Sequence, residues 1–570
     1  MSLFGSIRMA GNTLRANEIG LQVVGQNISN ANTPGYIREE VVFAPAPTQK
    51  YGSLLMGTGV DVVAIVEKLD AFLEQRICGA LSDQSSTDSL QQTYAQLEGI
   101  VGELNENGLG AAMNDFFSSI SEILNQPQDL SVRNLAVLQG DTLTRNINTM
   151  ALQTGQLRAD VNTQIANMAE QINGLTGKIA NLNIQIAEAE GGNVSKSDAV
   201  GLRDQRLQAL EELSKLIDIK ALEQPSGTVT VYSGGDYLVN DGTARTLNVT
   251  YQTDRGLSTA TLRIAGIDVP IDPSSGQLRG LLNSRDAVLG RFLDQLDAFA
   301  GTLAFEFNKV YSGGQGLTGY SPTAAQPMTS QAAVDDATQP LNAAGLKFTP
   351  ENGSFQVLVR NKQTGLTQTT NVTVNLSGLG TQTTLNHLTQ QLDQVAGLSA
   401  KVTADGRLQL SATGQDTEFA FANDTSGALA ALGINTLFTG SGARDLGINP
   451  EVRNDPSKFA ASRGGIGVDA ANAEQLAGFF DRPLDSQNGA SISVLYDRLT
   501  SDVAQGSSVA RAAADGAATF ANTLNGQKLA TSGVNLDEET INMLGYQQAY
   551  QAAAKYIATL NELLNVLTRL

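Results

Sequence analysis

The chain has 570 residues, with 37 Lys and Arg against 57 Asp and Glu, and a formal charge of −20 at neutral pH. An acidic chain without a cluster of basic residues is unsuited to binding nucleic acid or an anionic membrane, because both require positive charge. A single cysteine, Cys78, excludes an internal disulfide framework, and a single histidine, His387, excludes a zinc site built from several His and Cys ligands. Only 16% of the residues are charged, so the surface must owe its polarity largely to Asn, Gln, Ser and Thr.

The first residues do not form a basic region followed by a continuous apolar run, so we expect no cleavable secretory signal. No apolar run approaches the about 18 residues that a membrane-spanning helix needs, so we expect no membrane span.

The two ends of the chain carry the clearest helical periodicity. Apolar residues recur at alternating spacings of four and three, which is the pattern of a coiled-coil seam. The N-terminal seam, which also includes the polar residue Asn17, consists of Leu3, Ile7, Ala10, Leu14, Leu21, Val24 and Ile28. The C-terminal seam consists of Met543, Tyr546, Tyr550, Ala553, Ile557, Leu560, Leu564 and Leu567. We expect the chain to begin and end in paired coiled-coil-like helices.

Three further stretches have helical periodicity. Residues 154–190 predict a long helix, and residues 202–217 predict a second one that packs against it as an antiparallel pair. Residues 281–310 predict a third.

Two regions alternate with a period of two, as strands do. The first, at about residues 226–270, contains the turn Asn240-Asp241-Gly242 and predicts a small antiparallel sheet. The second, residues 355–421, predicts strands with a hairpin at 361–365, a turn at Asp405-Gly406 and one helix around 385–398. Residues 313–350 between the two regions are expected to be a loop.

The predicted fold is therefore mainly α with β-rich inserted domains. Residues 1–60 and 525–570 would form a terminal helical domain. Residues 61–325 and 456–524 would form a helical domain with the small sheet, and residues 326–455 a β-rich outer domain. Because the order is nested, we expect the two termini to lie together.

Two segments at opposite ends of the chain carry a family resemblance. The first, around Asn27, Ser29, Asn30, Asn32, Thr33, Gly35 and Tyr36, follows the N-terminal seam. The second runs from Ser532 to Glu539 and continues through Tyr546 to Lys555. Together they resemble the N- and C-terminal signatures of the bacterial flagellar axial proteins, the rod, hook and hook-associated family.

Two internal segments resemble the junction members of that family. They are the helix from Gly201 to Asp218 and the stretch from Leu437 to Ser462. The resemblance implies a structural subunit of the ring that joins hook to filament, exported without a cleavable signal through the flagellar type III channel. It implies as partners other copies in a ring, the hook protein, a second junction protein (hook-associated protein 3) and a type III export chaperone.

Three alternatives remain open. The chain could be another axial component, such as a hook or distal-rod protein. It could be a flagellar scaffold that carries a peptidoglycan hydrolase, which would use two carboxylates in the β-rich insert. The insert could also have an adhesive or antigenic role.

Several motifs resemble chemical sites, but their context argues against catalysis, a cofactor or a metal. Gly314 to Gly319 fits a dinucleotide-binding GxGxxG, yet it follows a helical pattern rather than a strand, so we expect a flexible loop. Gly177-Lys178 lacks the Ser or Thr of a phosphate-binding loop. His387 is expected on the surface of an amphipathic helix, and Cys78 on a buried apolar face. Acidic pairs such as Asp335-Asp336 are typical of turns and helix starts.

The terminal seams are instead expected to carry assembly. Residues 20–37 contain no charged side chain, which suits burial between subunits. We therefore predict that the ends are disordered in the free chain and become ordered on assembly.

Overall fold

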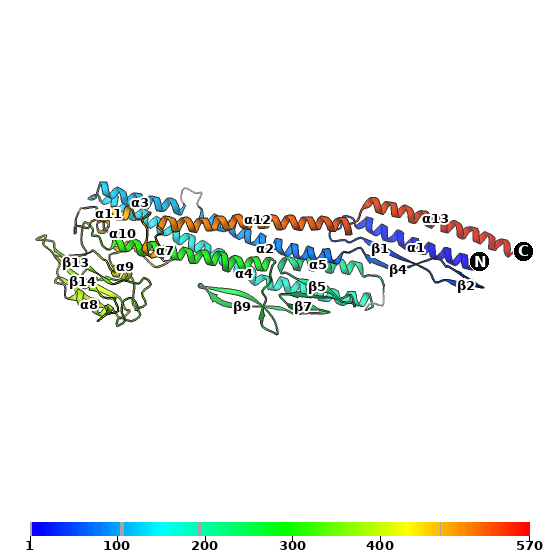
Figure 1. Ribbon diagram of the computed structural model, residues 1–570, viewed down its shortest axis with the longest axis horizontal. Helices are drawn as coiled ribbons and strands as arrows, with labels where there is room; N and C mark the ends of the chain where they lie inside the picture. The colour runs from blue at the N-terminus through cyan, green and yellow to red at the C-terminus, as the bar shows by residue number, and fades with distance from the viewer. Residues whose placement is uncertain (1–2, 103–107, 192–195, 468, 570) are drawn as a thin grey trace. The chain divides into compact units, whose positions relative to one another are not determined.

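The computed structural model describes residues 3–102, 108–191, 196–467 and 469–569. The chain divides into two compact units. Unit 1 comprises residues 1–93, 159–287 and 508–570, and unit 2 comprises residues 94–158 and 288–507. The long helices α2 (Ala71–Val101), α4 (Leu130–Ala189) and α12 (Ile492–Ser532) contribute residues to both units (Figure 1).

Unit 1 contains two terminal helices, two shorter helices and a set of antiparallel strands. In chain order these elements are α1 (Leu3–Asn30), β1 (Glu39–Pro45), β2 (Gln49–Tyr51), β3 (Leu54–Met56), β4 (Val60–Glu67), α5 (Val200–Leu216), β5 (Lys220–Glu223), β6 (Val229–Ser233), β7 (Asp236–Asn240), β8 (Thr243–Ala244), β9 (Leu247–Asp254), β10 (Leu257–Ile264), β11 (Val269–Pro270), α6 (Gln277–Asn283) and α13 (Leu536–Leu567).

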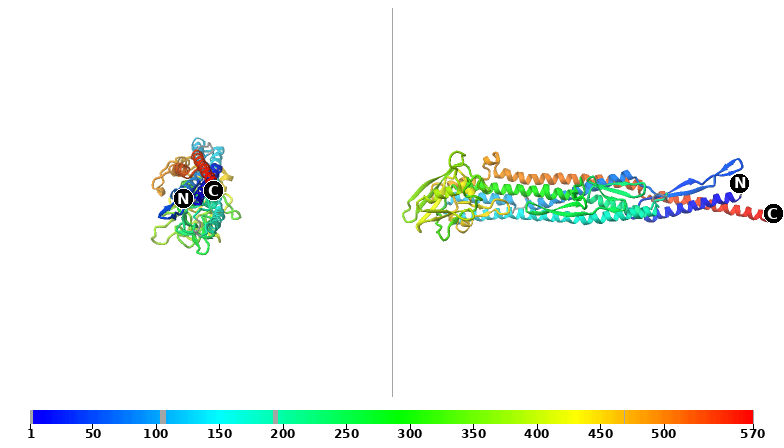
Figure 2. Two further views of the ribbon diagram at one scale, coloured as in Figure 1. Left: turned by 90° about the vertical axis from the view of Figure 1, so that its right-hand side faces the viewer. Right: turned by 90° about the horizontal axis from the view of Figure 1, so that it is seen from below.

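The terminal helices α1 and α13 lie side by side and run in opposite directions, so the start of α1 lies near the end of α13 (Figures 1 and 2). α13 begins at a capped turn, where the Asn535 side chain accepts hydrogen bonds from the backbone N–H groups of Asp537 and Glu538. Three acidic residues in its first turn stabilise the helix, because their negative charges lie at the positive end of the helix dipole. The predicted pairing of the two terminal helices is confirmed.

A long hairpin follows α1 and packs against it. Strands β1 and β4 pair antiparallel with a register shift at Val42/Phe43, and β2 and β3 pair in the same sense. The Asn12 side chain of α1 donates to the carbonyl of Thr58 at 3.3 Å. The hairpin was not predicted, because the strand periodicity in this stretch is short and is broken by Pro45 and Pro47.

The region predicted to form one small antiparallel sheet, at about residues 226–270, contains two, in the strand orders β5-β6-β7-β8 and β11-β10-β9. Asparagine side chains on α4 form hydrogen bonds with the backbone of both sheets. The Asn183 amide binds both the N–H and the C=O of Val229, and the Asn173 amide binds both groups of Leu247, at 2.7–3.0 Å. Asn162 bonds to the Ser258 carbonyl and the Ala260 N–H. Each amide therefore takes the hydrogen bonds that a neighbouring strand would otherwise make.

Unit 2 combines helices with small sheets. In chain order its elements are α3 (Leu109–Asn125), the π-helical turn Ser284–Leu289 at its border, α7 (Gly290–Tyr311), β12 (Met328–Thr329), β13 (Gly353–Asn361), β14 (Thr367–Val374), α8 (Leu385–Asp393), β15 (Leu398–Val402), β16 (Leu408–Ala412), β17 (Thr417–Ala422), α9 (Ala428–Leu432), β18 (Phe438–Thr439), β19 (Gly447–Ile448), α10 (Pro450–Asn454) and α11 (Ala471–Ala477), with short 3₁₀ turns at Pro456–Lys458 and Asp485–Gln487.

Two apolar cores occupy unit 2. Phe116, Phe117, Phe307, Phe438 and Phe479 form an aromatic cluster, with ring centroids 5.1–6.4 Å apart. The β-rich part has its own core, in which the sheets β14-β13-β17 and β12-β16-β15 surround α8 and α9. The prediction of a mainly helical chain with β-rich inserted parts is confirmed.

Two predicted helices have different bounds. The helix expected at 154–190 begins at Leu130, and its break at Gly191-Gly192-Asn193 falls partly on 192–195, outside the described residues. Gly140 lowers the helix propensity of this stretch, so the sequence does not reveal that the helix begins at Leu130. Glycine is needed at this position for close packing, because an added Cβ would lie 3.1 Å from Phe116 and 3.0 Å from Ile448. The helix expected around 385–398 ends at Asp393, because strand β15 begins at Leu398.

We predict that Asn183→Ala destabilises the attachment of β6 to α4 by about 3 kcal/mol, because it leaves buried backbone groups of Val229 unpaired. The Val229 amide would then exchange its hydrogen about a hundredfold faster. The matched control is Asn181→Ala, an exposed position two residues away on the same helix. Equal exchange rates in the two variants would show that the amide does not hold the strand.

Candidate functional site

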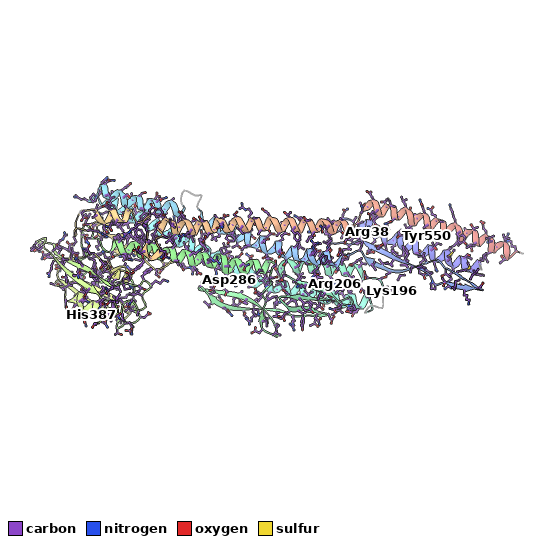
Figure 3. All side chains as sticks on the ribbon, viewed as in Figure 1. Arg38, Lys196, Arg206, Asp286, His387 and Tyr550 are labelled. Carbon is purple, nitrogen blue, oxygen red and sulfur yellow. The ribbon has the colours of Figure 1, made fainter. Side chains whose placement is uncertain are left out.

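The predicted seam residues are covered to different degrees within the single chain. On α13, Ala553 and Leu560 are 8% and 6% exposed, whereas Tyr550 is 39% exposed (Figure 3). The other described members of that seam, Met543, Tyr546, Ile557 and Leu564, are half-buried, and the side chain of Leu567 lies outside the described residues. On α1, Ala10, Asn17 and Val24 are buried, and Leu3, Ile7, Leu14, Leu21 and Ile28 are half-buried.

One close contact sets the register of the two terminal helices. The ring of Tyr546 on α13 lies against Gly20 on α1, where an added Cβ would approach the ring carbon Cζ to 2.9 Å. The other neighbour of the ring is Phe43 on β1, with 6.1 Å between ring centroids. Gly20 is therefore needed for close approach rather than for backbone conformation.

Asn27, near the end of α1, is the centre of a buried polar cluster that we call the polar joint. It also contains Tyr36, Glu39 and Glu539. The Asn27 Nδ2 donates to the Glu39 carbonyl at 3.0 Å and to Glu539 Oε2 at 3.2 Å. Its Oδ1 accepts from the Glu39 N–H at 2.9 Å and from the Tyr36 hydroxyl at 2.8 Å. With 1% of its surface exposed, Asn27 has all four of its hydrogen bonds satisfied by the two ends of the chain.

Arg38 strengthens the same joint. Its guanidinium lies 2.8 Å from Glu538 Oε2 and 2.7 Å from Glu539 Oε1, and its backbone N–H donates to the Ser532 carbonyl at 3.0 Å. Burial lowers the pKa of Arg38, but the two carboxylates outweigh it and the pKa is raised overall. The segment after α1 is thus tied to the α12–α13 turn (Figure 3).

The third signature segment, on α5, meets the joint through Asp204. Its carboxylate accepts a hydrogen bond from the Ile37 N–H, and burial raises its pKa to about 6. Burial also raises the pKa of Glu39, and it raises that of Tyr36 with further contributions from the charges of Glu39, Asp204 and Glu539. Three segments that are distant in sequence therefore converge on one polar cluster in unit 1.

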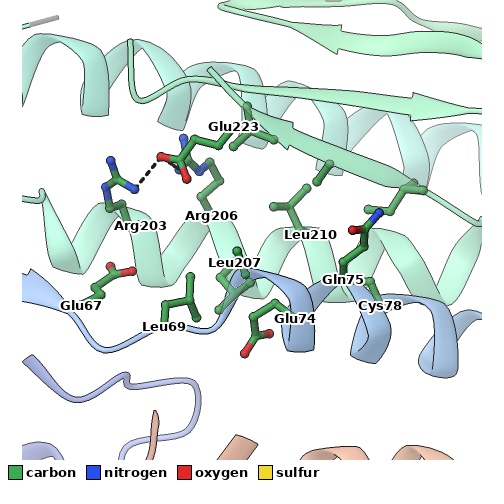
Figure 4. A pocket seen from close by; sticks show the side chains of 14 residues that line it. Glu67, Leu69, Glu74, Gln75, Cys78, Arg203, Arg206, Leu207, Leu210 and Glu223 are labelled. Atoms are coloured by element: carbon green, nitrogen blue, oxygen red, sulfur yellow. Dashed lines mark hydrogen bonds and ion pairs between the residues drawn. The ribbon is translucent and has the colours of Figure 1, made fainter. Parts of the chain in front are cut away.

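Beside the joint is a cavity of about 130 Å³, between the start of α2, the helix α5 and strands β5 and β6 (Figure 4). Glu67, Arg203, Arg206 and Glu223 line its charged end. Arg203 forms a salt bridge to Glu223 at 2.7 Å. Cys78 also lines the cavity, and burial raises the pKa of its thiol to about 12, so the thiol is unreactive at neutral pH.

The remaining signature residues shape the end of α1 and the turn after it, and do not enter the joint; they are Ser29, Asn30, Asn32, Thr33 and Gly35. Ser29 and Asn30 bond back to the carbonyls of Gly25 and Gln26. Thr33 and Tyr36 close a turn through a 3.2 Å backbone bond, in which Gly35 adopts a φ of 78°. Asn32 is exposed.

No individual role was predicted for several residues of the joint and its cavity, among them Arg38, Glu67, Asp204 and Glu539. A signal was available for Glu539, which lies four residues before Met543 on the seam of α13, because a charged residue on an apolar seam needs a partner. Arg38, Glu67 and Asp204 follow no such pattern, because the residues that bind or influence them are far away in the sequence.

The motifs that resembled chemical sites have structural roles. Gly314 to Gly319 lie in a loop between α7 and β12, as predicted, but this loop is not an exposed one. The segment is largely buried, and a Cβ at Gly316 would lie 2.5 Å from the Ser457 carbonyl oxygen. His387 is half-buried on α8 (Figure 3), where its backbone N–H is capped by Thr384. Within the described residues no group of three or more His, Cys, Asp or Glu side chains is arranged to bind a metal, and no described helix is long and apolar enough to cross a membrane.

Three family models match the chain. Residues 94–325 match the helical domain of the flagellar hook-associated protein FlgK, residues 526–570 match the C-terminal part of the flagellar basal body rod proteins FlgEFG, and residues 7–36 match the flagella basal body rod protein.

Relatives resemble the chain from end to end. Flagellar hook-associated protein 1 of Salmonella typhimurium strain LT2 is 25% identical over 588 residues, which cover 98% of this chain and 99% of that protein. The Escherichia coli K12 protein of the same name is 26% identical over 98% of both chains. In fold, the chain is similar to the flagellar hook junction protein FlgK from Burkholderia pseudomallei, with a TM-score of 0.50, 18% identity, and coverage of 80% of this chain and 100% of that one.

We predict that Gly20→Ala weakens the α1–α13 pair by about 1–3 kcal/mol, because the added methyl group forces the Tyr546 ring away. Amide hydrogen exchange along α13 would measure this. The matched control is Gly25→Ala on the same helix, where an added Cβ meets nothing within 4 Å and should be neutral or stabilising by up to about 1 kcal/mol. An unchanged exchange pattern in Gly20→Ala would rule out the tight Tyr546 contact.

Proposed function

We propose that this chain, an axial structural component of the bacterial flagellum, forms part of the junction between hook and filament and assembles through its terminal helices. The relatives that match 98% of the chain are named hook-associated proteins, which supports this position in the axis. The proposed role is mechanical, without catalysis.

The observation that carries the proposal is that α13 has a second apolar side, beyond the seam, which is exposed in the single chain. The described seam residues lie on one side, around Ala553 and Leu560. At 100° per residue, the other side presents Ile541, Leu544, Tyr556, Leu563 and Val566, which are 39–69% exposed. A helix that is apolar on both sides is stable when both are covered, and one chain covers only the first.

The scarcity of charge fits the same interpretation. Between residues 541 and 568, α13 and its end carry only Lys555 and Glu562, and residues 20–37 carry no charged side chain. Burying these surfaces between copies therefore requires little desolvation of charge. In the proposed assembly, the seam residues keep α1 and α13 together as a pair, and the outer side of α13 contacts neighbouring copies in a ring.

The remaining partners follow from the family resemblance. We propose that the ring contacts the hook protein on one side and a second junction protein, hook-associated protein 3, on the other. We also propose export through the flagellar type III channel with the help of a chaperone and without a cleavable signal.

We further propose three functional segments. Residues 1–60 with 525–570 serve axial packing, residues 61–325 with 456–524 form the supporting helical domain, and residues 326–455 form the outer domain. The separate apolar core of the β-rich part supports the last of these.

We predict that Leu14→Asp and Leu560→Asp on the seams, and Leu563→Asp on the outer side of α13, all block junction assembly, because each puts an unpaired charge at a contact that must exclude water. Reconstitution with hook protein, followed by electron microscopy, would measure assembly. The matched control is Asn565→Asp, which adds the same charge at an exposed position between the two sides.

In the free chain, the seam variants and Leu563→Asp are expected to differ in their effect on the α1–α13 pair. The seam variants would loosen the α1–α13 pair, whereas Leu563→Asp would leave it unchanged. Normal assembly of Leu563→Asp would disprove the role of the outer side, and normal assembly of both seam variants would disprove the role of the seams.

We also predict that amides in residues 3–36 and 532–569 exchange faster in the free chain than after assembly, because only neighbouring copies cover both sides of α13. Amide exchange on the free chain and on the reconstituted junction would test this, with the Val229 amide as an internal reference. Full protection of both ends in the dilute free chain would mean that assembly is not what orders them.

A further inference from the structure

The polar joint in unit 1 has more carboxylates than cations available to neutralise them. Glu67, at the end of β4, donates its backbone N–H to Asp198 Oδ2 at 3.1 Å, and its side chain lines the cavity beside α5. The charged groups that influence its side chain are Asp198, Arg203, Asp204 and Arg206. Those that influence Asp204 include Glu39 and Lys528.

The cations near the cavity are already bound to other groups. Arg203 binds Glu190 at 2.7 and 2.9 Å and Glu223 at 2.7 Å. Arg206 donates to the Gly227 carbonyl at 2.6 Å and to Asn183 Oδ1 at 3.1 Å.

Lys528 lies between two other carboxylates. Its Nζ is 2.9 Å from Glu74 and 2.6 Å from Glu211. Consequently no described salt bridge reaches the side chain of Glu67 or of Asp204.

Two buried carboxylate oxygens, Glu67 Oε1 and Asp204 Oδ1, have no hydrogen-bond partner among the described residues. A buried acceptor without a donor is costly, and a buried carboxylate without a counter-ion is costlier. A proton on one of the two groups removes one of the two buried charges.

The pKa values agree with this arrangement. Burial and then the charge of Asp204 raise the pKa of Glu67 to about 8. The pKa of Asp204 is about 6, as given above. Because the charge of Asp204 raises the pKa of Glu67, the two groups together hold one proton between about pH 6 and pH 8.

We propose that Glu67 and Asp204 form a proton-dependent latch, in which one shared proton keeps the segment after α1 closed against α5 at neutral pH. Loss of the proton leaves two negative groups in a joint without a free cation. Repulsion between the two carboxylates then separates β4, which carries Glu67, from α5. Strand β1 pairs with β4, so the segment around Ile37 leaves α5 with it and the α1–α13 pair loses its attachment to α5.

The direction of the pH effect follows from linkage. The closed joint holds a proton that the open joint releases, because an exposed Glu has an ordinary pKa of 4.5. Opening therefore becomes easier as pH rises, by at most about tenfold per pH unit between pH 6 and 8, and it levels off above pH 8.

The test uses trypsin cleavage after Arg38, whose guanidinium is held in the closed joint, in the full-length free chain. Its rate is divided by the rate after Lys362, an exposed site in the β13–β14 turn, to remove the pH dependence of trypsin itself. The expected ratio rises about 10- to 100-fold from pH 6 to pH 8 and is constant above pH 8. A constant ratio from pH 6 to pH 8 would overturn the proposal.

Variants test whether the pH dependence of cleavage after Arg38 arises from Glu67 and Asp204. Glu67→Gln is neutral at every pH, so its ratio should stay low and flat. Asp204→Asn should shift the rise to lower pH, because it removes the charge that raises the pKa of Glu67. The matched control, Glu188→Gln on the exposed side of α4, should follow the unmodified chain. A wild-type slope in Glu67→Gln would also overturn the proposal.

If the joint of the Glu67→Gln variant is open at every pH, a second measurement tests whether the unmodified joint holds a proton at neutral pH. Infrared spectroscopy of the unmodified chain should show the carbonyl stretch of a protonated carboxylic acid at pH 7, and this band should disappear at pH 9. Absence of the band at pH 7 would overturn the proposal. Both measurements use the free chain, so their outcome is independent of whether the chain assembles at the junction.

Discussion

The structure depends on one repeated interaction, in which a side-chain carboxamide binds both the N–H and the C=O of a single backbone residue. Asn27 binds Glu39 in this way. The same pairing joins Asn173 to Leu247, Asn183 to Val229, Asn308 to Phe438 and Gln391 to Thr373. An amide can do this because it carries a donor and an acceptor side by side, as a neighbouring strand does. Helices and strands are thereby joined without ionic groups, which fits a chain with few charges.

Several charged side chains of unit 1 gather at the joint between the terminal helices and α5. Three of the four segments that carried the family resemblance contribute Asn27, Tyr36, Asp204 and Glu539 to this one place. The proposed junction role requires the terminal pair to be both attached and able to adapt to neighbours. A joint built from hydrogen bonds and poorly neutralised acids can be opened at lower cost than an apolar core of the same size.

Much of the helical framework could be predicted from the sequence, because periodicity is a local signal. Ala553 and Leu560, on the predicted seam, are among the most buried residues of α13. The β1–β4 hairpin could not be predicted, since its strands are held by α1 and by each other rather than by a clear alternation. The roles of Asn162, Asn173 and Asn183 were also hidden, because an asparagine bonded to a strand cannot be distinguished in sequence from one exposed to water. Pairings across hundreds of residues, such as that of Asn27 with Glu539, leave no local trace at all.

The asparagines of α4 also constrain how its length can change. They are separated by 11 and 10 residues, close to three helical turns, so all three lie within about 80° of one another around the helix. Inserting one residue between them would turn everything beyond it by about 100° and shift it by about 1.5 Å. Asn183 would then face away from Val229, and β6 would lose its attachment although no residue of the sheet had changed. Insertions or deletions in this part of the helix should therefore add or remove close to whole helical turns. The strands bound beyond the change would then move along the helix axis by the same distance.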